Sequence, residues 1–280
     1  MSQWIGNGLE GWSEKLLTTK FDTLLVDEPE PQVLRVTLNR PDASNAFNTL
    51  CGHELFSIFH PLEIDRNRFR CVIITGAGDK AFCAGGDLKE RKQLDEHEWV
   101  LQHEFFERTF RHVLNCPIPV IAAVNGAAYG GGLELALQCD FAYASRTARF
   151  ALSEVSLGIM PGGGGTQTLS RIVGERRAKE LILAAKPFTA EQALSWGVIN
   201  QVCEPEALME QTLLIARRIA SHAPLAVRQA KHSIHHGLQM DINSAMLFEI
   251  EAYQRMVKSE DRIEGVLAFN EKRAPVFKGR

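Results

Sequence analysis

The chain has 280 residues, of which 45% are hydrophobic and 23% charged, a composition typical of a globular protein and unlike that of a disordered or collagen-like chain. Lys and Arg number 31 against 34 Asp and Glu, which gives a formal net charge of -3, so a general attraction to nucleic acid or to an anionic membrane is not expected. No apolar run reaches the roughly 18 residues of a membrane-spanning helix, and we therefore predict neither a membrane nor a nucleic-acid partner.

In chain order, the first predicted elements are two strands, Asp22–Asp27 and Val33–Leu38, joined by a proline-containing turn. In the second strand apolar and polar residues alternate, the period of two that is typical of a half-buried strand. The polar loop 39–45 follows. The next helix is expected to begin near Thr49 and to end or bend at Pro61, because proline interrupts helical hydrogen bonding.

Two unbroken apolar runs, Cys71–Thr75 and Pro119–Val124, predict strands that are covered on both faces. The segment Glu96–Asn115 between them has helical character. Strands separated by helices favour parallel β-α-β units, and so the predicted fold class is α/β.

Beyond about Gly174 the pattern becomes mainly helical, and only Val198–Val202 is predicted as a strand. Apolar residues recur at helical spacing through most of this part of the chain. Helices are expected around Leu181 and at Ala190–Trp196, Leu208–Ala220, Pro224–His236 and Ile242–Val257.

The cysteines carry no C-x-x-C pair and most of them lie in apolar runs. A chain of this length can bury a core that needs no disulfide, so reduced, buried thiols are expected. Met1–Lys20 resembles neither a secretory signal nor a transit peptide. We predict a cytoplasmic protein, with a trimmed organellar protein as the alternative. The cysteines are Cys51, Cys71, Cys83, Cys116, Cys139 and Cys203.

Several common catalytic patterns are incomplete. Gly76–Ala81 fits the dinucleotide-binding G-x-G-x-x-A, but no following strand ends in an acidic residue. The glycine run after Pro161 lacks the lysine of a Walker loop, and neither a zinc-protease H-E-x-x-H nor a G-x-S-x-G is present. His232, His235 and His236 would share a helix face and could bind a metal, but a solvated helix face explains them better, and we predict no metal.

Glycine-rich segments that follow strand-like runs carry the strongest signal. The helix predicted after Gly130–Gly132 would direct free N–H groups out of the carboxyl edge of a sheet. A second amide, from the turn Ala84–Gly85, would complete an oxyanion hole of two donors.

Two glutamates accompany these amides. Glu134 lies in the first turn of the predicted helix, and Glu154 lies in a mostly apolar stretch. Burial would raise the pKa of such a carboxyl toward neutrality, as proton transfer requires. Glu134 could instead stabilise the helix dipole and Glu154 could form a buried ion pair, so the residue pattern alone leaves the roles of both open.

Four segments occur in a characteristic order: FCAGGDLK (82–89), AVNGAAYGGGLELALQCD (123–140), FALSEVSLGIMPGGGGTQTL (150–169) and IEGVLAFNEKR (263–273). Together they resemble the crotonase superfamily, most of all its enoyl-CoA hydratases, including the AU-binding methylglutaconyl-CoA hydratase type. The resemblance covers Thr23 to the C-terminus and implies a spiral of ββα turns followed by a helical trimerisation region. We therefore divide the chain into an N-terminal extension (1–20), a spiral core (21–203) and a helical oligomerisation region (204–280).

The resemblance implies hydration of a 2-enoyl-CoA thioester, with Glu134 activating water and Glu154 protonating the α-carbon. It also implies that the oxyanion-hole N–H groups are those of Ala84 and Gly131. It also implies an acyl-CoA partner, a homotrimer or dimer of trimers, and no separate cofactor, because coenzyme A is part of the substrate. The positions matching the family's CoA-binding segments are Ala43, Ser44, Ala46, Ala84, Gly85, Gly86, Asp87 and Leu88, with Phe269 and Lys272 reaching the nucleotide, often from a neighbouring subunit.

Two alternatives stay open. Another crotonase reaction, such as isomerisation, dehydration or decarboxylation, is disfavoured by the two glutamates, because many isomerases of the family keep only one. An RNA-binding or scaffold protein is suggested by the AU-binding relatives and by a small basic cluster at Arg66, Arg68 and Arg70, which lacks the lysine density of an RNA surface.

Overall fold

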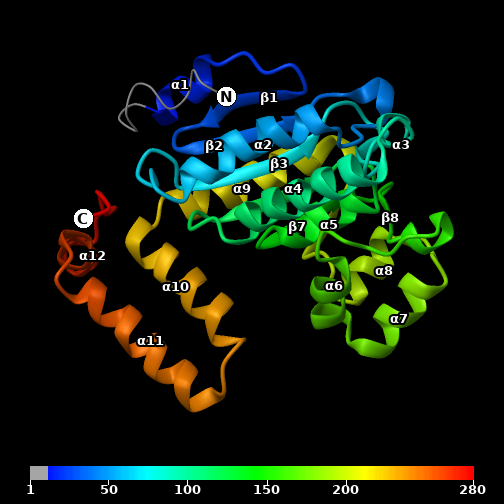
Figure 1. Ribbon diagram of the computed structural model, residues 1–280. Helices are drawn as coiled ribbons and strands as arrows, with labels where there is room; N and C mark the ends of the chain where they lie inside the picture. The colour runs from blue at the N-terminus through cyan, green and yellow to red at the C-terminus, as the bar shows by residue number, and fades with distance from the viewer. Residues whose placement is uncertain (1–11) are drawn as a thin grey trace.

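The computed structural model describes residues 12–280, and its strands form two sheets (Figure 1). The larger sheet has the order β1-β2-β3-β5-β7-β10 and the smaller has the order β4-β6-β8-β9. The strands are β1 (Leu24–Glu30), β2 (Val33–Leu38), β3 (Cys71–Gly76), β4 (Ala81–Cys83), β5 (Val120–Val124), β6 (Ala127–Tyr129), β7 (Phe141–Ser145), β8 (Arg149–Ala151), β9 (Phe188–Thr189) and β10 (Gln201–Cys203).

The chain winds as a spiral, because each turn gives one strand to each sheet before a helix follows. β3 and β4, β5 and β6, and β7 and β8 are three such pairs of consecutive strands. From β2 through β10 the neighbours in the larger sheet are parallel, and only β1 pairs with β2 in the antiparallel direction. The predicted α/β class with a ββα spiral is therefore what the structure has.

Helices surround the sheets and then extend beyond them (Figure 1). Most of the predicted helices occur with boundaries shifted by one or two residues. They are α1 (Trp12–Thr18), α2 (Thr49–Leu62), α3 (Leu88–Arg91), α4 (Glu96–Leu114), α5 (Gly131–Gln138), α6 (Gly165–Val173), α7 (Glu175–Leu183), α8 (Ala190–Ser195), α9 (Leu208–Ala220), α10 (Pro224–Gly237), α11 (Ile242–Val257) and α12 (Glu260–Glu271), with 3₁₀ turns η1 (Pro41–Ala43), η2 (Glu154–Leu157) and η3 (Pro205–Ala207).

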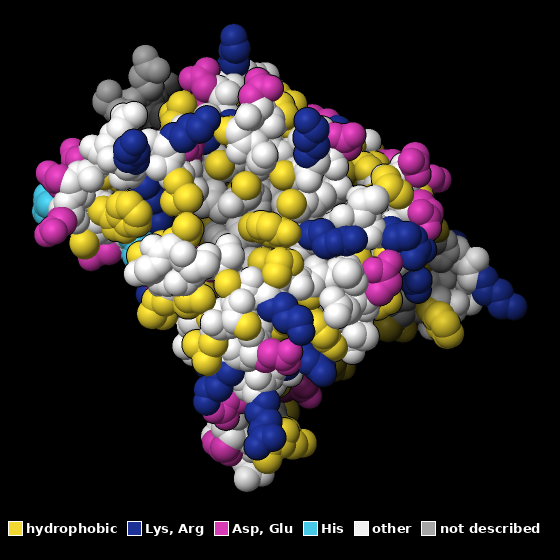
Figure 2. Space-filling view, turned by 90° about the vertical axis from the view of Figure 1, so that its right-hand side faces the viewer, with side chains coloured by type: hydrophobic (Ala, Val, Ile, Leu, Met, Phe, Trp, Pro, Cys, Tyr) yellow, Lys and Arg dark blue, Asp and Glu magenta, His cyan; other side chains and the backbone are white. Residues whose placement is uncertain are grey.

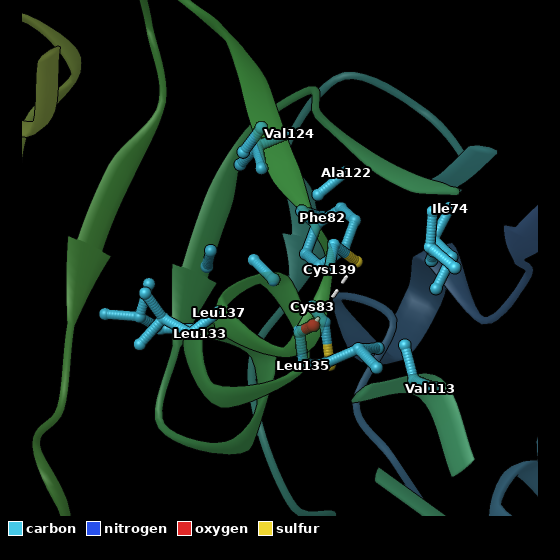
Figure 3. Packing of buried hydrophobic residues seen from close by; sticks show 14 of the residues in the cluster. Ile74, Phe82, Cys83, Val113, Ala122, Val124, Leu133, Leu135, Leu137 and Cys139 are labelled. Atoms are coloured by element: carbon cyan, nitrogen blue, oxygen red, sulfur yellow. Dashed lines mark hydrogen bonds between the residues drawn. The ribbon is translucent and has the colours of Figure 1, made fainter. Parts of the chain in front are cut away.

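The unbroken apolar run of β3 is explained by packing on both sides of the larger sheet. Cys71 and Ile73 face a cluster that includes Ala216 of α9. Val72 and Ile74 face the main core, where Figure 3 shows Ile74 among side chains from β4, β5, α4 and α5. Each fully buried side chain of this kind contributes roughly 1.5–3 kcal/mol, so the pattern directly stabilises the spiral.

The largest differences from the sequence predictions are the short strands. β4, β6 and β8 have three residues each, too few for periodicity to show. β10 begins at Gln201, not at Val198, and β1 continues to Glu30 through the expected turn. α2 passes through Pro61 and ends one residue later.

The N- and C-terminal segments differ in how they lie against the core. The predicted extension 1–20 lies outside the described residues up to position 11, and within α1 the side chain of Leu16 is buried in the core. At the other end, α10 and α11 project from the body and α12 lies far from α3 (Figure 1). Among residues 12–280, no helix is long and apolar enough to cross a membrane.

Candidate active site

Three loops that follow neighbouring strands of the smaller sheet meet at one edge. β4, β6 and β8 lie side by side and are parallel, so their carboxyl ends point the same way. Residues 84–87 follow β4, Gly130 and Gly131 follow β6, and Glu154 lies just beyond β8. The topology therefore brings together segments that are up to 70 residues apart in sequence.

A cavity of about 640 Å³ opens at this edge. Its polar lining includes Glu134, Glu154 and the 84–86 loop, and its apolar lining comes mainly from α4 and the segment 157–160. A volume of this size is typical of a small-molecule site. The apolar residues of the lining are Phe47, Leu88, Trp99, Val100, Phe106, Phe110, Leu157, Ile159 and Met160.

The amide predicted at Ala84 is not available as an oxyanion donor. Its N–H donates to the Ser44 carbonyl at 3.1 Å, so this donor is already used by the backbone. The Gly86 amide is available instead. The Phe47 carbonyl accepts from the Asp87 N–H and the Phe47 N–H donates to the Gly85 carbonyl, so Phe47 pairs with the backbone on both sides of Gly86. In strand-like pairing the intervening N–H points the opposite way, and among residues 12–280 the Gly86 N–H has no backbone acceptor.

Gly131 provides the second amide, at the first position of α5. A Cβ placed on Gly131 would lie 3.8 Å from the Gly86 nitrogen, so the two residues are close neighbours. Helix α5 can begin here because Gly132 packs directly on β4, where a Cβ would lie 2.0 Å from the Cys83 carbonyl oxygen. The first-turn N–H groups of a helix carry partial positive charge, so Gly86 and Gly131 form an amide pair suited to an anionic oxygen.

Glu134 is held with one oxygen fixed and the other toward the cavity. Its side chain lies in α5 and is only 4% exposed. Oε1 accepts hydrogen bonds from the Gly163 and Gly165 amides, both at 2.8 Å, and a Cβ placed on Gly131 would lie 4.0 Å from Oε2. Burial raises the pKa of Glu134 to about 7, the two amides oppose this rise, and the charge of Glu154 adds to it.

Glu154 begins η2 and is 9% exposed. Among residues 12–280, neither of its buried carboxylate oxygens has a hydrogen-bond partner. A Cβ on Gly130 would lie 3.1 Å from Oε1, so the carboxyl group is next to the start of α5. Burial raises the pKa of Glu154, against the influence of the Arg91 charge. Two carboxyls with raised pKa values in one cavity are suited to holding and transferring protons.

The predicted CoA-binding residues divide into two groups. Ala84, Gly85, Gly86 and Leu88 line the cavity. Ala43, Ser44, Ala46 and Asp87 do not line it. Four hydrogen bonds hold this region in place. Arg40 bonds both the Ala46 carbonyl and the Asp87 carboxylate, and the Asn45 amide donates to the carbonyls of Ala77 and Ala81.

Phe269 and Lys272 are not brought to the cavity of their own chain. Both lie at the end of α12, and Phe269 is 84% exposed. In Figure 1 this helix and α3 are at opposite ends of the molecule. Neither residue is therefore part of the cavity lining of its own chain.

Sequence reasoning missed four residues of the site. The Gly163 and Gly165 amides anchor Glu134, and only the unexplained glycine run pointed to them. Arg91, the last residue of α3, lines the cavity. His103 does so too, and burial together with the Arg91 charge lowers its pKa.

The groups considered for metal or RNA lie elsewhere. His232 and His236 pack on Phe248. A different trio, His60, Glu63 and His112, has ligand atoms within 4.8 Å of one another at the far end of α4. Arg68 pairs with Glu28, and Figure 2 shows both charge signs spread over the face that carries α6 and α7.

Comparison with known proteins gives a consistent result. The family model described as "Enoyl-CoA hydratase/isomerase" matches residues 28–280. The short-chain-enoyl-CoA hydratase of Clostridium acetobutylicum is 44% identical over 88% of this chain and 94% of its own, and the crotonyl-CoA hydratase of Syntrophomonas wolfei is 40% identical over 90% and 97%.

A solved structure of enoyl-CoA hydratase from Bacillus anthracis superposes with a TM-score of 0.91, at 41% identity, over 92% of this chain and all of that one. Similarity of this extent confirms both the crotonase resemblance and the predicted fold. The chain belongs to the enoyl-CoA hydratase/isomerase family.

Proposed function

We propose that the protein is an enoyl-CoA hydratase, which adds water across the 2,3 double bond of an acyl-CoA thioester. The observation that carries this proposal is the pair of buried glutamates beside two adjacent backbone amides in one cavity. The proposal is also supported by the two hydratases described above, to which the chain is similar over most of its length.

The proposed mechanism assigns one role to each group. Glu134 accepts a proton from water through Oε2 while the water oxygen bonds the β-carbon. Negative charge moves to the thioester oxygen, which the Gly86 and Gly131 amides stabilise. Glu154 gives its proton to the α-carbon. Transfer of the proton held by Glu134 to Glu154 then returns both carboxyls to their starting protonation states. Raised pKa values suit both glutamates to these transfers.

The test is hydration of crotonyl-CoA, monitored as the decrease in absorbance of the conjugated thioester. Glu134→Gln and Glu154→Gln should each lower kcat by at least about a hundredfold, the usual value of one acid-base group. Full activity in both variants would overturn the mechanism. Offering 3-enoyl-CoA beside 2-enoyl-CoA tests isomerisation, which would yield the conjugated thioester without added water.

The oligomeric state and location belong to the same proposal. Exposed apolar side chains recur along α10–α12, and a concentration of this kind is typical of an interaction surface. A trimer or dimer of trimers would cover them and would carry Phe269 and Lys272 to the CoA of a neighbouring subunit. Light scattering on the purified protein tests the assembly. A cytoplasmic location stays a prediction. The most exposed of these side chains are Ile234, Leu238, Ile242, Met246, Leu247, Tyr253 and Phe269.

RNA binding is the less supported alternative. The Arg68 guanidinium is paired with Glu28, and Arg70 donates to the backbone carbonyls of Ala220 and Phe277. Two members of the basic cluster are therefore engaged in packing. Salt-dependent retention of RNA at physiological ionic strength would revive this function.

A further inference from the structure

The cavity contains a cation that the proposed hydration does not use. Arg91 ends the short helix α3 and is the one Lys or Arg among the described residues that line the cavity. The remaining lining is apolar or consists of glycine, serine, His103 and acidic residues. A hydrocarbon acyl chain would have no use for a guanidinium at this place.

The neighbours of Arg91 fix its orientation. Its Nε donates to the Gln102 Oε1 at 3.1 Å, and the guanidinium lies over the Trp99 ring, 4.8 Å from the centroid. Gln102 is itself held, since its amide donates to Thr49 and Glu90. The side chain is thus positioned by packing on one face and by one hydrogen bond at Nε.

The two terminal nitrogens of Arg91 are left unpaired. Among residues 12–280, neither donates a hydrogen bond and no carboxylate forms an ion pair with the guanidinium, whereas Arg40, which lies outside the cavity lining, is paired with Asp87. Burial lowers the pKa of Arg91, and the more distant charges of Glu134, Glu90 and Glu154 oppose that change. The group is therefore desolvated in part without a direct counter-ion.

The guanidinium lies at the end of the cavity where the proposed reaction takes place. A Cβ placed on Gly86 would lie 3.3 Å from the Arg91 Cζ, so the charge is next to the proposed oxyanion amides. A group that meets Arg91 is then part of the acyl chain and not of the nucleotide. The amide pair would bring the thioester and the acyl chain attached to it into this region.

Filling the cavity with a hydrocarbon would strip water from an unpaired cation, which is unfavourable, whereas a carboxylate would pair with both free nitrogens. We propose that Arg91 is a specificity residue that selects acyl-CoA substrates whose acyl chain carries a carboxylate. This inference rests on the proposed function and adds the chemical class of the acyl group.

A simpler role would be that Arg91 only offsets the charge of the glutamate pair. In that case, replacing Arg91 would change the turnover of every acyl chain by the same factor. If Arg91 binds a substrate carboxylate, the ratio between charged and neutral acyl chains changes. The ratio of kcat/KM values is therefore the measurement that separates the two roles.

The test compares 4-carboxybut-2-enoyl-CoA with 5-methylhex-2-enoyl-CoA, in which an isopropyl group replaces the carboxylate. We expect the wild-type enzyme to favour the carboxylated substrate at least tenfold in kcat/KM. In Arg91→Met that ratio should fall about a hundredfold, while Arg91→Lys, which keeps the charge, should retain part of it. Arg218→Met, on the exposed side of α9, is the control for removing a surface charge.

A binding measurement makes the result independent of turnover. The saturated thioesters 4-carboxybutanoyl-CoA and 5-methylhexanoyl-CoA should show the same preference in calorimetry, and Arg91→Met should abolish it. A wild-type ratio at or below one, or an equal loss for both acyl chains, would overturn the specificity role. Absence of hydration with every enoyl-CoA, despite selective binding of the carboxylated thioester, would instead count against the proposed function alone.

Discussion

Replacing Glu134 by Gln should remove activity and at the same time stabilise the protein at alkaline pH. The side-chain amide oxygen of the Glu134→Gln variant can still accept the bonds that the Gly163 and Gly165 amides now make at 2.8 Å, so the packing of α5 against α6 is kept. The variant lacks only the ionisable oxygen that faces the cavity. The activity prediction is a loss of at least about a hundredfold in kcat.

The stability prediction follows from the pKa of Glu134, which burial raises from 4.5 to about 7. Because the folded-state pKa is above the unfolded value, the folded protein holds the proton more tightly. The free energy of unfolding of the wild type therefore decreases as the pH rises from about 4.5 to 7. At 1.36 kcal/mol per pKa unit, the decrease is about 3 kcal/mol, and Glu134→Gln does not undergo it.

The assay is urea unfolding of both proteins at pH 5 and at pH 8. The free energy of unfolding of Glu134→Gln, measured relative to that of the wild type, should increase by about 3 kcal/mol from pH 5 to pH 8. Glu210→Gln, which removes an exposed carboxylate from α9, is the matched control. A stability difference that is the same at both pH values would refute the claim that a desolvated carboxyl is held at this position.

The remaining predictions concern the other parts of the site. Gly131→Pro fits the first position of α5 but deletes one donor, so kcat should fall by the factor that corresponds to about 3 kcal/mol with the melting temperature nearly unchanged. Gly132→Ala places a methyl group 2.0 Å from the Cys83 carbonyl oxygen, and thermal denaturation should show a loss of at least about 2 kcal/mol. In pH profiles, kcat/KM should rise through an apparent pKa near 7, and Glu134→Gln should lack that rise; a profile identical in both proteins would exclude Glu134 as the base.

The sequence predicted those features that are expressed in long patterns. Unbroken apolar runs indicated β3 and β5, and helical spacing indicated most of α4 through α11. β4, β6 and β8 have three residues each, and no periodicity can identify strands of that length. The site lies at the ends of these short strands, so its position came from ordered glycine and glutamate segments and from the family resemblance.

The direction of a backbone amide was beyond sequence reasoning. Ala84 and Gly86 lie in the same short loop, and their residue types do not tell which N–H is free. Only the pairing of Phe47 with the backbone around Gly86, and the bond from Ala84 to Ser44, decide this. Arg91 was missed for a related reason, because its lack of a counter-ion depends on contacts from α4.

The most direct test of the proposed catalytic arrangement is a crystal structure of the protein with a bound 2-enoyl-CoA analogue. The thioester oxygen should accept hydrogen bonds from both the Gly86 and the Gly131 amides, at about 2.7–3.1 Å. The β-carbon of the acyl chain should face Glu134. A thioester oxygen that meets neither amide, or an acyl chain bound away from both glutamates, would contradict the account.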